Sequence, residues 1–200
     1  MKRLGLLLAL LLAALGFGAT SAHAVSTIVL DAGHGGHDRG GVPGQRYSEK
    51  AATLDTAQRI RSRLRAAGFK VVMTRSSDSF IGLGQRCAVA NRQRDAAFVS
   101  VHYNSAPREG ANGIETYFYY GHGRALAETL HARIVRAAGT EDRYVRQRGF
   151  YVLRRTRIPA VLCELGFLTN GSEGGRIAKS GAHRQRLANA VADGIIALYK

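Results

Sequence analysis

Histidine and glutamate side chains stand in four short segments that could together form a metal-dependent hydrolytic site. The segments are DAGHGGHDRGG at 31–41, YSEK at 47–50, SVHYN at 100–104 and VLCELGF at 161–167. Two imidazoles and one carboxylate are a ligand set for a catalytic zinc that keeps one position open for water. A further carboxylate can accept the proton of that water. This combination of residue types predicts metal-assisted hydrolysis.

Three of these residues also have a purely structural interpretation. His34 stands among glycines and fits a turn histidine, and His102 fits a satisfied histidine of the core. Glu49 fits a carboxylate at the start of a helix, where the helix dipole favours negative charge and Ser48 supplies capping chemistry. The residue types alone leave these alternatives open.

Glu164 is the hardest of the four to explain by structure alone. It interrupts an apolar run, with Ala-Val-Leu-Cys before it and Leu-Gly-Phe after it. Burying a carboxylate in such a run is costly unless it is paired, protonated or bound to a ligand. Its position therefore favours a chemical role.

The elements that position these residues alternate between strand and helix along the chain. Short apolar or β-branched runs predict strands at 26–30, 70–74, 97–101, 113–120, 150–153 and 160–165. Apolar residues at helical spacing predict helices over 48–67, 83–94, 126–137 and 187–198. Gly68 follows the first of these helices, as a C-terminal cap glycine would.

This alternation predicts the α/β class, as a single domain over 25–200 with a mixed, mostly parallel sheet and helices on both faces. The last two predicted strands, joined by a short turn, indicate that the sheet is mixed. In open α/β sheets, ligands bind outside the carboxyl ends of the strands. His34 follows the first strand, His102 closes the third and Glu164 lies near the end of the last. We therefore expect the site at this edge of the sheet.

The first 24 residues have the features of a secretory signal peptide. The basic residues Lys2 and Arg3 precede an apolar stretch over 4–15, which is too short to cross a bilayer comfortably. Ala22 and Ala24 then offer the small side chains that a signal peptidase reads. We expect cleavage after them, so that the protein is exported to the periplasm or secreted and has no transmembrane segment.

The chain is strongly basic. Its formal net charge of +15 falls to +13 when the two cations Lys2 and Arg3 are removed. Such a charge favours polyanionic partners. Export and the lack of a recognisable binding motif argue against nucleic acid, so anionic cell-envelope polymers are the expected partners. Solvated helix surfaces are the ordinary alternative for much of this charge. We expect the exported protein to be a monomer.

Two cysteines, Cys87 and Cys163, remain after export, and they lack the CxxC spacing of a metal or redox site. An oxidising compartment permits a disulfide. Cys163 nevertheless lies in an apolar run and Cys87 on a helical pattern, so we expect both to be buried and unpaired. The other histidines of the exported chain have no comparable setting, and we interpret them as surface or loop residues. They are His37, His122, His131 and His183.

Several longer stretches resemble the zinc-dependent N-acetylmuramoyl-L-alanine amidases of the amidase-3 type. They are 28–38, 48–50, 74–75, 99–104, 113–117 and 158–170, with Asp78, Leu83, Arg86, Ala90 and Asn91 between them. They occur in the family's order and cover nearly all of 25–200, so the combined pattern is specific although each piece is short. Cys163 departs from the aliphatic or polar residue expected before the glutamate, which the chemistry tolerates.

The resemblance implies a peptidoglycan hydrolase with a six-stranded sheet and one zinc ion per chain. It implies that His34, Glu49 and His102 bind the zinc and that Glu164 is the catalytic carboxylate. The implied reaction cleaves the amide bond between N-acetylmuramic acid and L-alanine of the stem peptide. A zinc-activated water would attack, with Glu164 as general base and then general acid.

Two further expectations concern the surroundings of the zinc. Asp31 or Asp38 is expected to orient His34 as a hydrogen-bond acceptor, and the sequence does not decide between them. Some relatives carry a long inserted helix, between the second histidine and the final glutamate, that blocks the zinc. The stretch 139–153 is too short for such an insertion. We therefore expect an open site.

Overall fold

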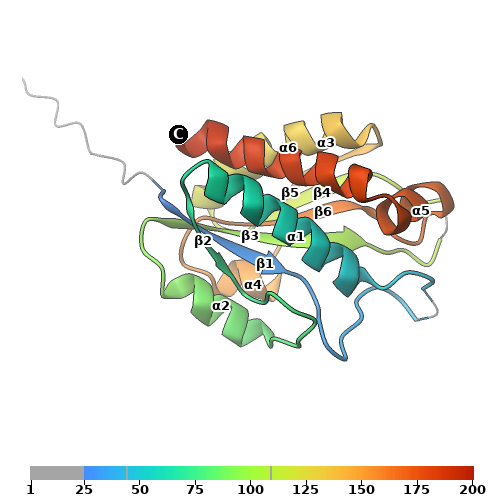
Figure 1. Ribbon diagram of the computed structural model, residues 1–200, viewed down its shortest axis with the longest axis horizontal. Helices are drawn as coiled ribbons and strands as arrows, with labels where there is room; N and C mark the ends of the chain where they lie inside the picture. The colour runs from blue at the N-terminus through green and yellow to red at the C-terminus, as the bar shows by residue number, and fades with distance from the viewer. Residues whose placement is uncertain (1–24, 44, 109) are drawn as a thin grey trace, which may run out of the picture.

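The computed structural model in Figure 1 describes residues 25–43, 45–108 and 110–200 of the chain. The expected signal peptide, residues 1–24, lies outside the described residues, and its cleavage stays a prediction. Within the described part of the chain, no helix is both long enough and apolar enough to span a membrane.

One six-stranded sheet forms the centre of the fold, in the order β2-β1-β3-β6-β4-β5. Its strands are β1 (Thr27–Ala32), β2 (Lys70–Met73), β3 (Ala96–Asn104), β4 (Ile114–Phe118), β5 (Asp142–Gln147) and β6 (Ala160–Phe167). Strands β1, β2, β3 and β6 run parallel, whereas β4 is antiparallel to β6 and pairs in parallel with β5. The predicted α/β class and the mixed, mostly parallel sheet are confirmed.

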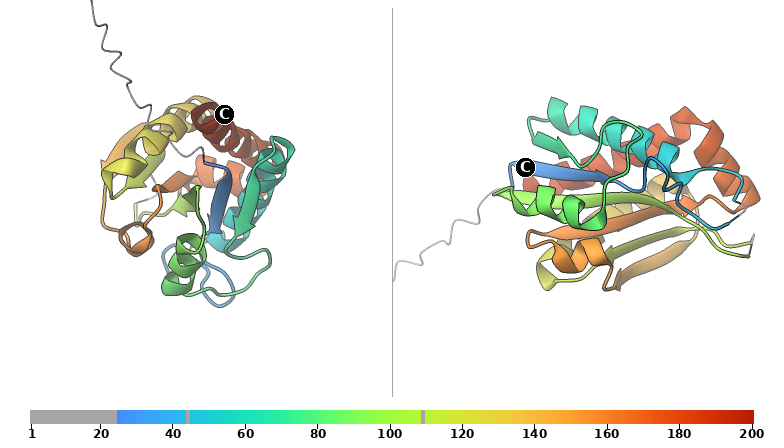
Figure 2. Two further views of the ribbon diagram at one scale, coloured as in Figure 1. Left: turned by 90° about the vertical axis from the view of Figure 1, so that its left-hand side faces the viewer. Right: turned by 90° about the horizontal axis from the view of Figure 1, so that it is seen from below.

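Helices cover both faces of the sheet, as Figures 1 and 2 show. Helices α1 (Glu49–Ala66), α3 (Arg124–Ala138) and α6 (Gly181–Tyr199) pack on one face. Helices α2 (Leu83–Asn91) and α4 (Tyr151–Arg155) pack together on the other. Helix α5 (Gly171–Lys179) adjoins β6 and α6, and a short 3-10 turn at Gly121–Gly123 leads into α3.

The alternation of side chains along the strands divides the core into two layers. In β1, Ile28 and Leu30 belong to the larger cluster under α1, α3 and α6, whereas Val29 belongs to the smaller cluster under α2 and α4. In β6, Cys163 belongs to the larger cluster and Leu162 to the smaller one. Successive residues of a strand point to opposite faces of the sheet, so a residue's parity decides its layer.

The same alternation decides where the polar residues of the strands lie. Asp31, His102 and Glu164 share the parity of the smaller cluster, and all three line one cleft together with Val152 of α4. The site therefore opens on the side of the sheet that α2 and α4 cover.

Helix α1 ends where the sequence predicts. Gly68 follows it with a φ of 85°, a conformation that favours glycine. The N–H of Gly68 donates to the carbonyl of Arg65 at 2.9 Å. At the other end, Ser48 precedes the helix without a side-chain cap. Its hydroxyl instead donates to the carbonyl of Arg39 at 3.3 Å.

The predicted strand at 150–153 is wrong, because these residues form the start of α4. The N–H groups of Leu153 and Arg154 donate to the carbonyl of Phe150 at 3.0 and 2.9 Å. Val152 and Leu153 both belong to the smaller core cluster, an arrangement that a helical turn permits and a regular strand does not. A short apolar run has no periodicity that separates helix from strand. The antiparallel pair in the sheet is therefore β4 with β6.

Strand β5 and helix α5 are elements that the sequence did not predict. Strand β5 lies at the edge of the sheet, and its residues are all exposed or only half-buried, so its sequence shows no buried face. Helix α5 contains three glycines in nine residues, which weakens its helix propensity. The side chain of Asn170 caps it by accepting the N–H groups of Ser172 and Glu173, at 3.1 and 2.9 Å.

Cys87 and Cys163 are buried and unpaired, as expected. His131 and His183 are also buried, so their interpretation as surface or loop residues is wrong. The Nε2 of His131 lies 2.8 Å from the carboxylate of Asp142. A partner supplied from another element, here from β5, makes burial of this histidine tolerable.

Candidate active site

The structure brings His34, Glu49 and His102 together at the carboxyl edge of the sheet. Their potential ligand atoms all lie within 4.8 Å of one another. The Nε2 of His34 lies 3.0 Å from one carboxylate oxygen of Glu49, and the Nδ1 of His102 lies 2.9 Å from the other. The two imidazole rings meet edge to face, with centroids 4.9 Å apart. Two imidazoles and one carboxylate therefore form a possible metal site.

Glu49 is the first residue of α1, where the helix dipole favours a carboxylate. Its side chain is buried, and it also accepts the N–H of Tyr103 at 3.0 Å. Burial by itself raises the pKa of Glu49, but the hydrogen bonds from His102 and His34 outweigh it and lower the pKa to about 2. Glu49 is therefore a charged carboxylate at neutral pH, as a metal ligand must be.

Asp38, rather than Asp31, is the residue that orients His34. The Nδ1 of His34 donates to the carboxylate of Asp38 at 2.8 Å, which leaves Nε2 facing Glu49. The N–H of Gly40 donates to the same carboxylate at 3.0 Å. Burial lowers the pKa of His34, but the hydrogen bonds with Glu49 and Asp38 raise it overall.

Glycines at 33 and 40 leave the space that the site's side chains occupy. A Cβ atom at Gly33 would lie 2.3 Å from Cε1 of His102. A Cβ atom at Gly40 would lie 2.6 Å from both Cδ2 of His34 and Oε2 of Glu49. The backbone at Gly40 also has a φ of 69°, which favours glycine. These glycines are therefore explained by close approach to the possible metal ligands.

Two buried arginines, whose roles sequence reasoning missed, hold the loop that carries His34. Arg86 donates to the carboxylate of Asp31 at 2.7 Å and to the carbonyl of His34 at 2.8 Å. Arg75 donates to the carbonyl of Gly33 at 2.8 Å. Both arginines stand in or between the family-like stretches. Their backbone partners lie 42 and 52 residues away along the chain and cannot be recognised from sequence. Asp31 therefore acts on His34 indirectly, through Arg86.

Glu164 lies on β6 between two other polar residues of the sheet. Its register partners are His102 on β3 and Glu115 on β4. Its Oε2 atom is buried and has no hydrogen-bond partner among the described residues. Burial, together with the charges of Glu49 and Glu115, raises the pKa of Glu164 well above its usual range. A carboxyl group with a raised pKa and a buried oxygen that lacks a partner is a candidate for proton exchange with a ligand.

Glu115 is a second buried carboxylate near the site, and sequence reasoning gave it no role. It accepts hydrogen bonds from the side-chain amide of Asn104 at 2.6 Å, the hydroxyl of Tyr117 at 2.8 Å and the guanidinium of Arg143 at 3.3 Å. Glu115 is thus well partnered where Glu164 is not. Its charge is one of the causes that raise the pKa of Glu164.

The four predicted site residues all line one cleft of about 650 Å³. The side chains of His34 and His102 keep 22% and 18% of their surface exposed, so both imidazoles are accessible. Helix α4 borders this cleft through Tyr151 and Val152. The possible metal site is therefore reached from solvent through a pocket large enough for a substrate.

The fold and the site define a class of protein, an α/β domain with a two-histidine, one-carboxylate metal site beside a partly buried glutamate. Residues 28–197 match the family model described as N-acetylmuramoyl-L-alanine amidase. The chain therefore belongs to the N-acetylmuramoyl-L-alanine amidase family.

Individual amidases that resemble this chain in sequence or structure support its membership of the family. The probable cell wall amidase LytH of Staphylococcus aureus is 39% identical over 171 residues, which are 84% of this chain and 57% of LytH. This chain thus spans little more than half the length of that relative. The catalytic domain of CwlV, an N-acetylmuramoyl-L-alanine amidase from Bacillus (Paenibacillus) polymyxa var. colistinus, superposes with a TM-score of 0.83 at 37% identity. The match covers 88% of this chain and 99% of that one. The N-acetylmuramoyl-L-alanine amidase AmiC2 of Nostoc punctiforme superposes with a TM-score of 0.80 at 37% identity. The match covers 86% of this chain and 96% of AmiC2.

Proposed function

We propose that this chain is a peptidoglycan hydrolase that cleaves the amide bond between N-acetylmuramic acid and L-alanine of the stem peptide. Family membership supports the reaction class. The observation that carries the proposal is Glu164, whose buried oxygen has no partner in a cleft that it shares with the three possible metal ligands.

We propose zinc as the metal, with one ion per chain held by His34, Glu49 and His102. Imidazole nitrogens and a carboxylate suit zinc, and this ligand number leaves one position open. The hydrogen bond to Asp38 fixes the tautomer of His34 in which Nε2 is available for a metal. When bound, zinc supplies a Lewis acid that activates water and stabilises negative charge on the carbonyl oxygen.

Glu164 is proposed to move the proton. As a carboxylate, it takes a proton from the water that attacks the lactyl carbonyl of muramic acid. As an acid, it returns that proton to the nitrogen of the departing L-alanine, so the amide C–N bond breaks with a neutral amine as product. The pKa of Glu164 is raised by burial and by Glu49 and Glu115, which keeps its acid form accessible closer to neutral pH.

Mass spectrometry of digested sacculi tests this proposal. Purified protein should release intact stem peptides that begin with L-alanine and should leave peptide-free glycan strands. It should do so without an added activator, because the cleft already reaches both imidazoles. A zinc peptidase that acts within the stem peptide would instead leave a peptide stub on the glycan, and that product would contradict the proposal.

The Asp38→Asn substitution is expected to weaken zinc binding by about 10- to 100-fold, since it disturbs the hydrogen bond that orients His34. Zinc affinity is measured by competition with a chromogenic chelator. The control is Asp78→Asn, which alters an anchor of the same loop, because Asp78 accepts the N–H of Gly36 at 2.8 Å. Equal losses in the two variants would show that loop anchoring, rather than orientation of His34, sets the affinity.

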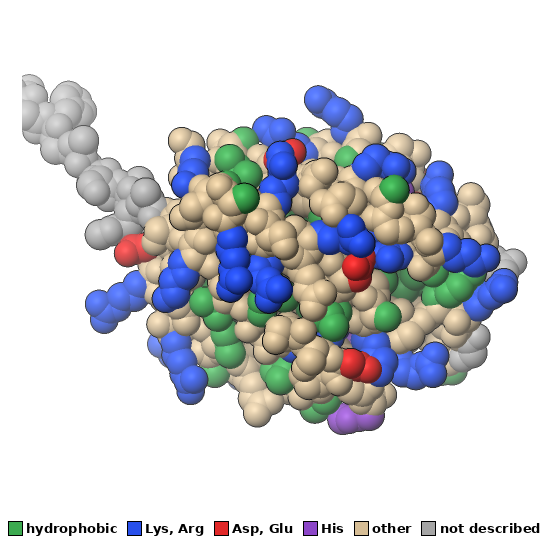
Figure 3. All heavy atoms as spheres, viewed as in Figure 1, with side chains coloured by type: hydrophobic (Ala, Val, Ile, Leu, Met, Phe, Trp, Pro, Cys, Tyr) green, Lys and Arg blue, Asp and Glu red, His purple; other side chains and the backbone are tan. Residues whose placement is uncertain are grey.

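We propose that the protein is exported after cleavage before Val25, that it is a monomer, and that its basic surface helps it associate with anionic cell-envelope polymers. Figure 3 shows Lys and Arg side chains spread over the face that α1 and α6 form. Some are neutralised, since Arg59 and Arg184 pair with Asp55 and Arg63 pairs with Asp193. The surrounding cations leave this face with an excess of positive charge.

Association of residues 25–200 with whole sacculi is expected to weaken as salt is raised. The reason is that exposed charges are screened beyond about 8 Å at physiological ionic strength. Co-sedimentation across a salt series measures this dependence, and hydrolysis of a small soluble muropeptide in the same series serves as the control for activity. Salt-independent sedimentation would remove any role for the excess charge.

A further inference from the structure

One side of the cleft is a wall of exposed apolar side chains, formed by Phe80, Leu83, Phe150 and Tyr151. Their exposed fractions are 48%, 54%, 40% and 40%. Among the described residues, six large hydrophobic side chains are exposed to this degree, and these four all line the one cleft. Such clustering of exposed apolar surface marks a binding surface rather than scattered surface residues.

The rings of this apolar wall are held in place by neighbours. Phe150 packs edge to face on Tyr117 with ring centroids 4.9 Å apart, and Phe80 lies against the ring of His37 at 4.2 Å. A Cβ atom at Gly84 would lie 3.8 Å from the hydroxyl of Tyr151, so Tyr151 lies over the start of α2. The wall is therefore one surface built from two segments, and it is largely formed before a ligand binds.

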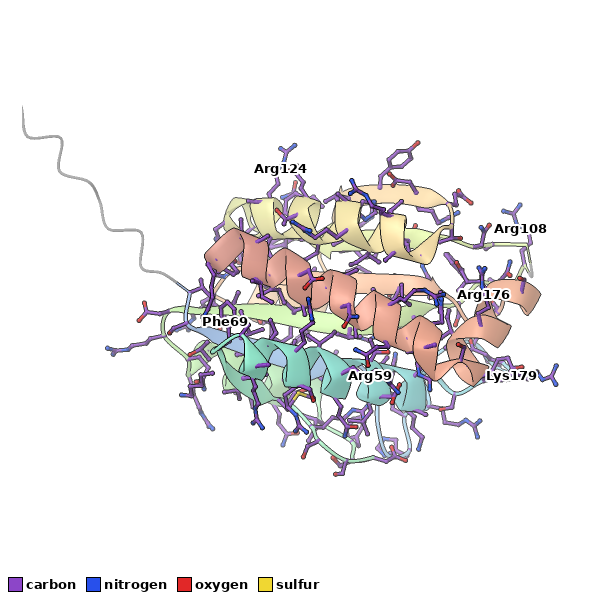
Figure 4. All side chains as sticks on the ribbon, turned by 45° about the horizontal axis from the view of Figure 1, so that its top comes forward. Arg59, Phe69, Arg108, Arg124, Arg176 and Lys179 are labelled. Carbon is purple, nitrogen blue, oxygen red and sulfur yellow. The ribbon has the colours of Figure 1, made fainter. Side chains whose placement is uncertain are left out.

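The surface beyond the possible metal site is more polar than the apolar wall, and we call it the polar side. Asn104 and Ser105 line the cleft there, and Val42 is shared with a second hollow of about 630 Å³. Arg46 and Asn170 line this hollow, together with apolar residues such as Tyr47 and Leu168. Figure 4 shows further cations, Arg108, Arg176 and Lys179, at this end of the molecule. The polar side therefore offers cationic and amide groups, which the apolar wall lacks, beside its own apolar side chains.

The two parts of the proposed substrate differ in the same way. A pyranose ring presents a face of C–H groups that packs against aromatic and aliphatic side chains. A stem peptide presents amide groups and carboxylates, which require hydrogen bonds or cations when they leave water. We infer that the apolar wall of Phe80, Leu83, Phe150 and Tyr151 binds sugar rings of the glycan strand and that the stem peptide extends toward the polar side. This inference rests on the proposed amidase function.

The absence of tryptophan from the sequence provides a direct test. In zinc-loaded protein carrying Glu164→Gln to prevent turnover, Phe150→Trp places a single tryptophan in the wall and keeps its aromatic character, and its emission can be excited apart from that of the tyrosines. A peptide-free tetrasaccharide of alternating N-acetylglucosamine and N-acetylmuramic acid should change its emission saturably, and free stem peptide should not. Tyr144→Trp is the matched control, because Tyr144 is 66% exposed on β5 and does not line the cleft.

Kinetics of otherwise unmodified enzyme provide an independent readout. Tyr151→Ala and Leu83→Ala should each raise KM for a disaccharide-peptide substrate about three- to tenfold with little change in kcat. Tyr144→Ala, outside the cleft, should retain the wild-type KM. A substrate with the lactyl-peptide bond but no sugar ring should not distinguish the variants from wild type.

Two results would overturn the inference. The first is a change in tryptophan emission with free stem peptide but none with the tetrasaccharide. The second is an equal rise in the KM of Tyr151→Ala and Leu83→Ala for substrates with and without a sugar ring. Neither result touches the proposed function, which fails separately if wild-type enzyme does not hydrolyse the disaccharide-peptide at all. The tetrasaccharide titration does not depend on hydrolysis, so the two failures are distinguishable.

Discussion

Removal of the metal is expected to abolish amide hydrolysis, and one equivalent of zinc is expected to restore it. His34, Glu49 and His102 come from three separate elements and place their ligand atoms within 4.8 Å of one another, which is the arrangement a single ion needs. Without the ion, Glu164 would have to activate the water alone, and no Lewis acid would stabilise the negative charge on the carbonyl oxygen. Hydrolysis of sacculi before and after chelation, with metal analysis of the purified protein, measures both the dependence and the stoichiometry.

Substitution of the histidines separates zinc binding from general damage to the fold. His102→Ala should lose both stoichiometric zinc and hydrolysis, whereas His122→Ala should retain both, because His122 is exposed and lies outside the cluster. Zinc should also raise the unfolding temperature of wild-type protein but not of His102→Ala, since a ligand that binds only the folded state stabilises it. Undiminished hydrolysis by metal-free protein would overturn the zinc proposal.

The layered fold was predictable because its central elements are strongly patterned. The buried runs that became β1 and β3 are nearly continuous in apolar residues, and α1 repeats its apolar residues at helical spacing up to Gly68. Prediction failed where local pattern and tertiary role diverge. The Phe-Tyr-Val-Leu run at 150–153 has strand-like residues, yet it packs as a helical turn on α2. Helix α5 was not predicted because its glycines weaken its helix propensity, and β5 was not predicted because an exposed edge strand shows no buried face in its sequence.

The site residues were predictable as a set, although their roles remain predictions. His34, Glu49, His102 and Glu164 follow strands or begin a helix, and the topology of an α/β sheet brings such positions to one edge. The structure places all four in one cleft and brings the first three within reach of one ion.

The supporting contacts of the site were beyond sequence analysis, because they depend on register and on backbone acceptors. Asp38, rather than Asp31, accepts from His34 because the loop returns on itself through paired backbone hydrogen bonds between Gly35 and Asp38, at 2.9 and 3.1 Å. Glu115 lies beside Glu164 only because β4 inserts antiparallel to β6 in one particular register. Neither the turn geometry nor the register is encoded by residue type alone.

Glu115 and Glu164 are neighbouring carboxylates that differ in their hydrogen-bond partners, and this difference distinguishes a structural role from a chemical one. Both lie on the same face of the sheet, as register partners on adjacent strands. Glu115 accepts three hydrogen bonds, whereas Oε2 of Glu164 has no partner among the described residues. A carboxylate oxygen that accepts no hydrogen bond from the protein is free to interact with a ligand. This difference selects Glu164, rather than Glu115, as the carboxylate whose removal should lower turnover.

Glu164→Ala and the closer isostere Glu164→Gln are expected to lower kcat by about 10²- to 10⁴-fold, the usual loss when a general acid–base group is removed. Both variants should keep one zinc per chain, because Glu164 is proposed to move the proton and not to bind the metal. Glu128→Gln, an exposed substitution on α3, is the control and should keep wild-type kcat. Single-turnover hydrolysis of a soluble muropeptide, paired with metal analysis, tests both expectations. Loss of stoichiometric zinc from Glu164→Ala would instead make Glu164 a metal ligand and would leave Glu49 as the candidate proton carrier.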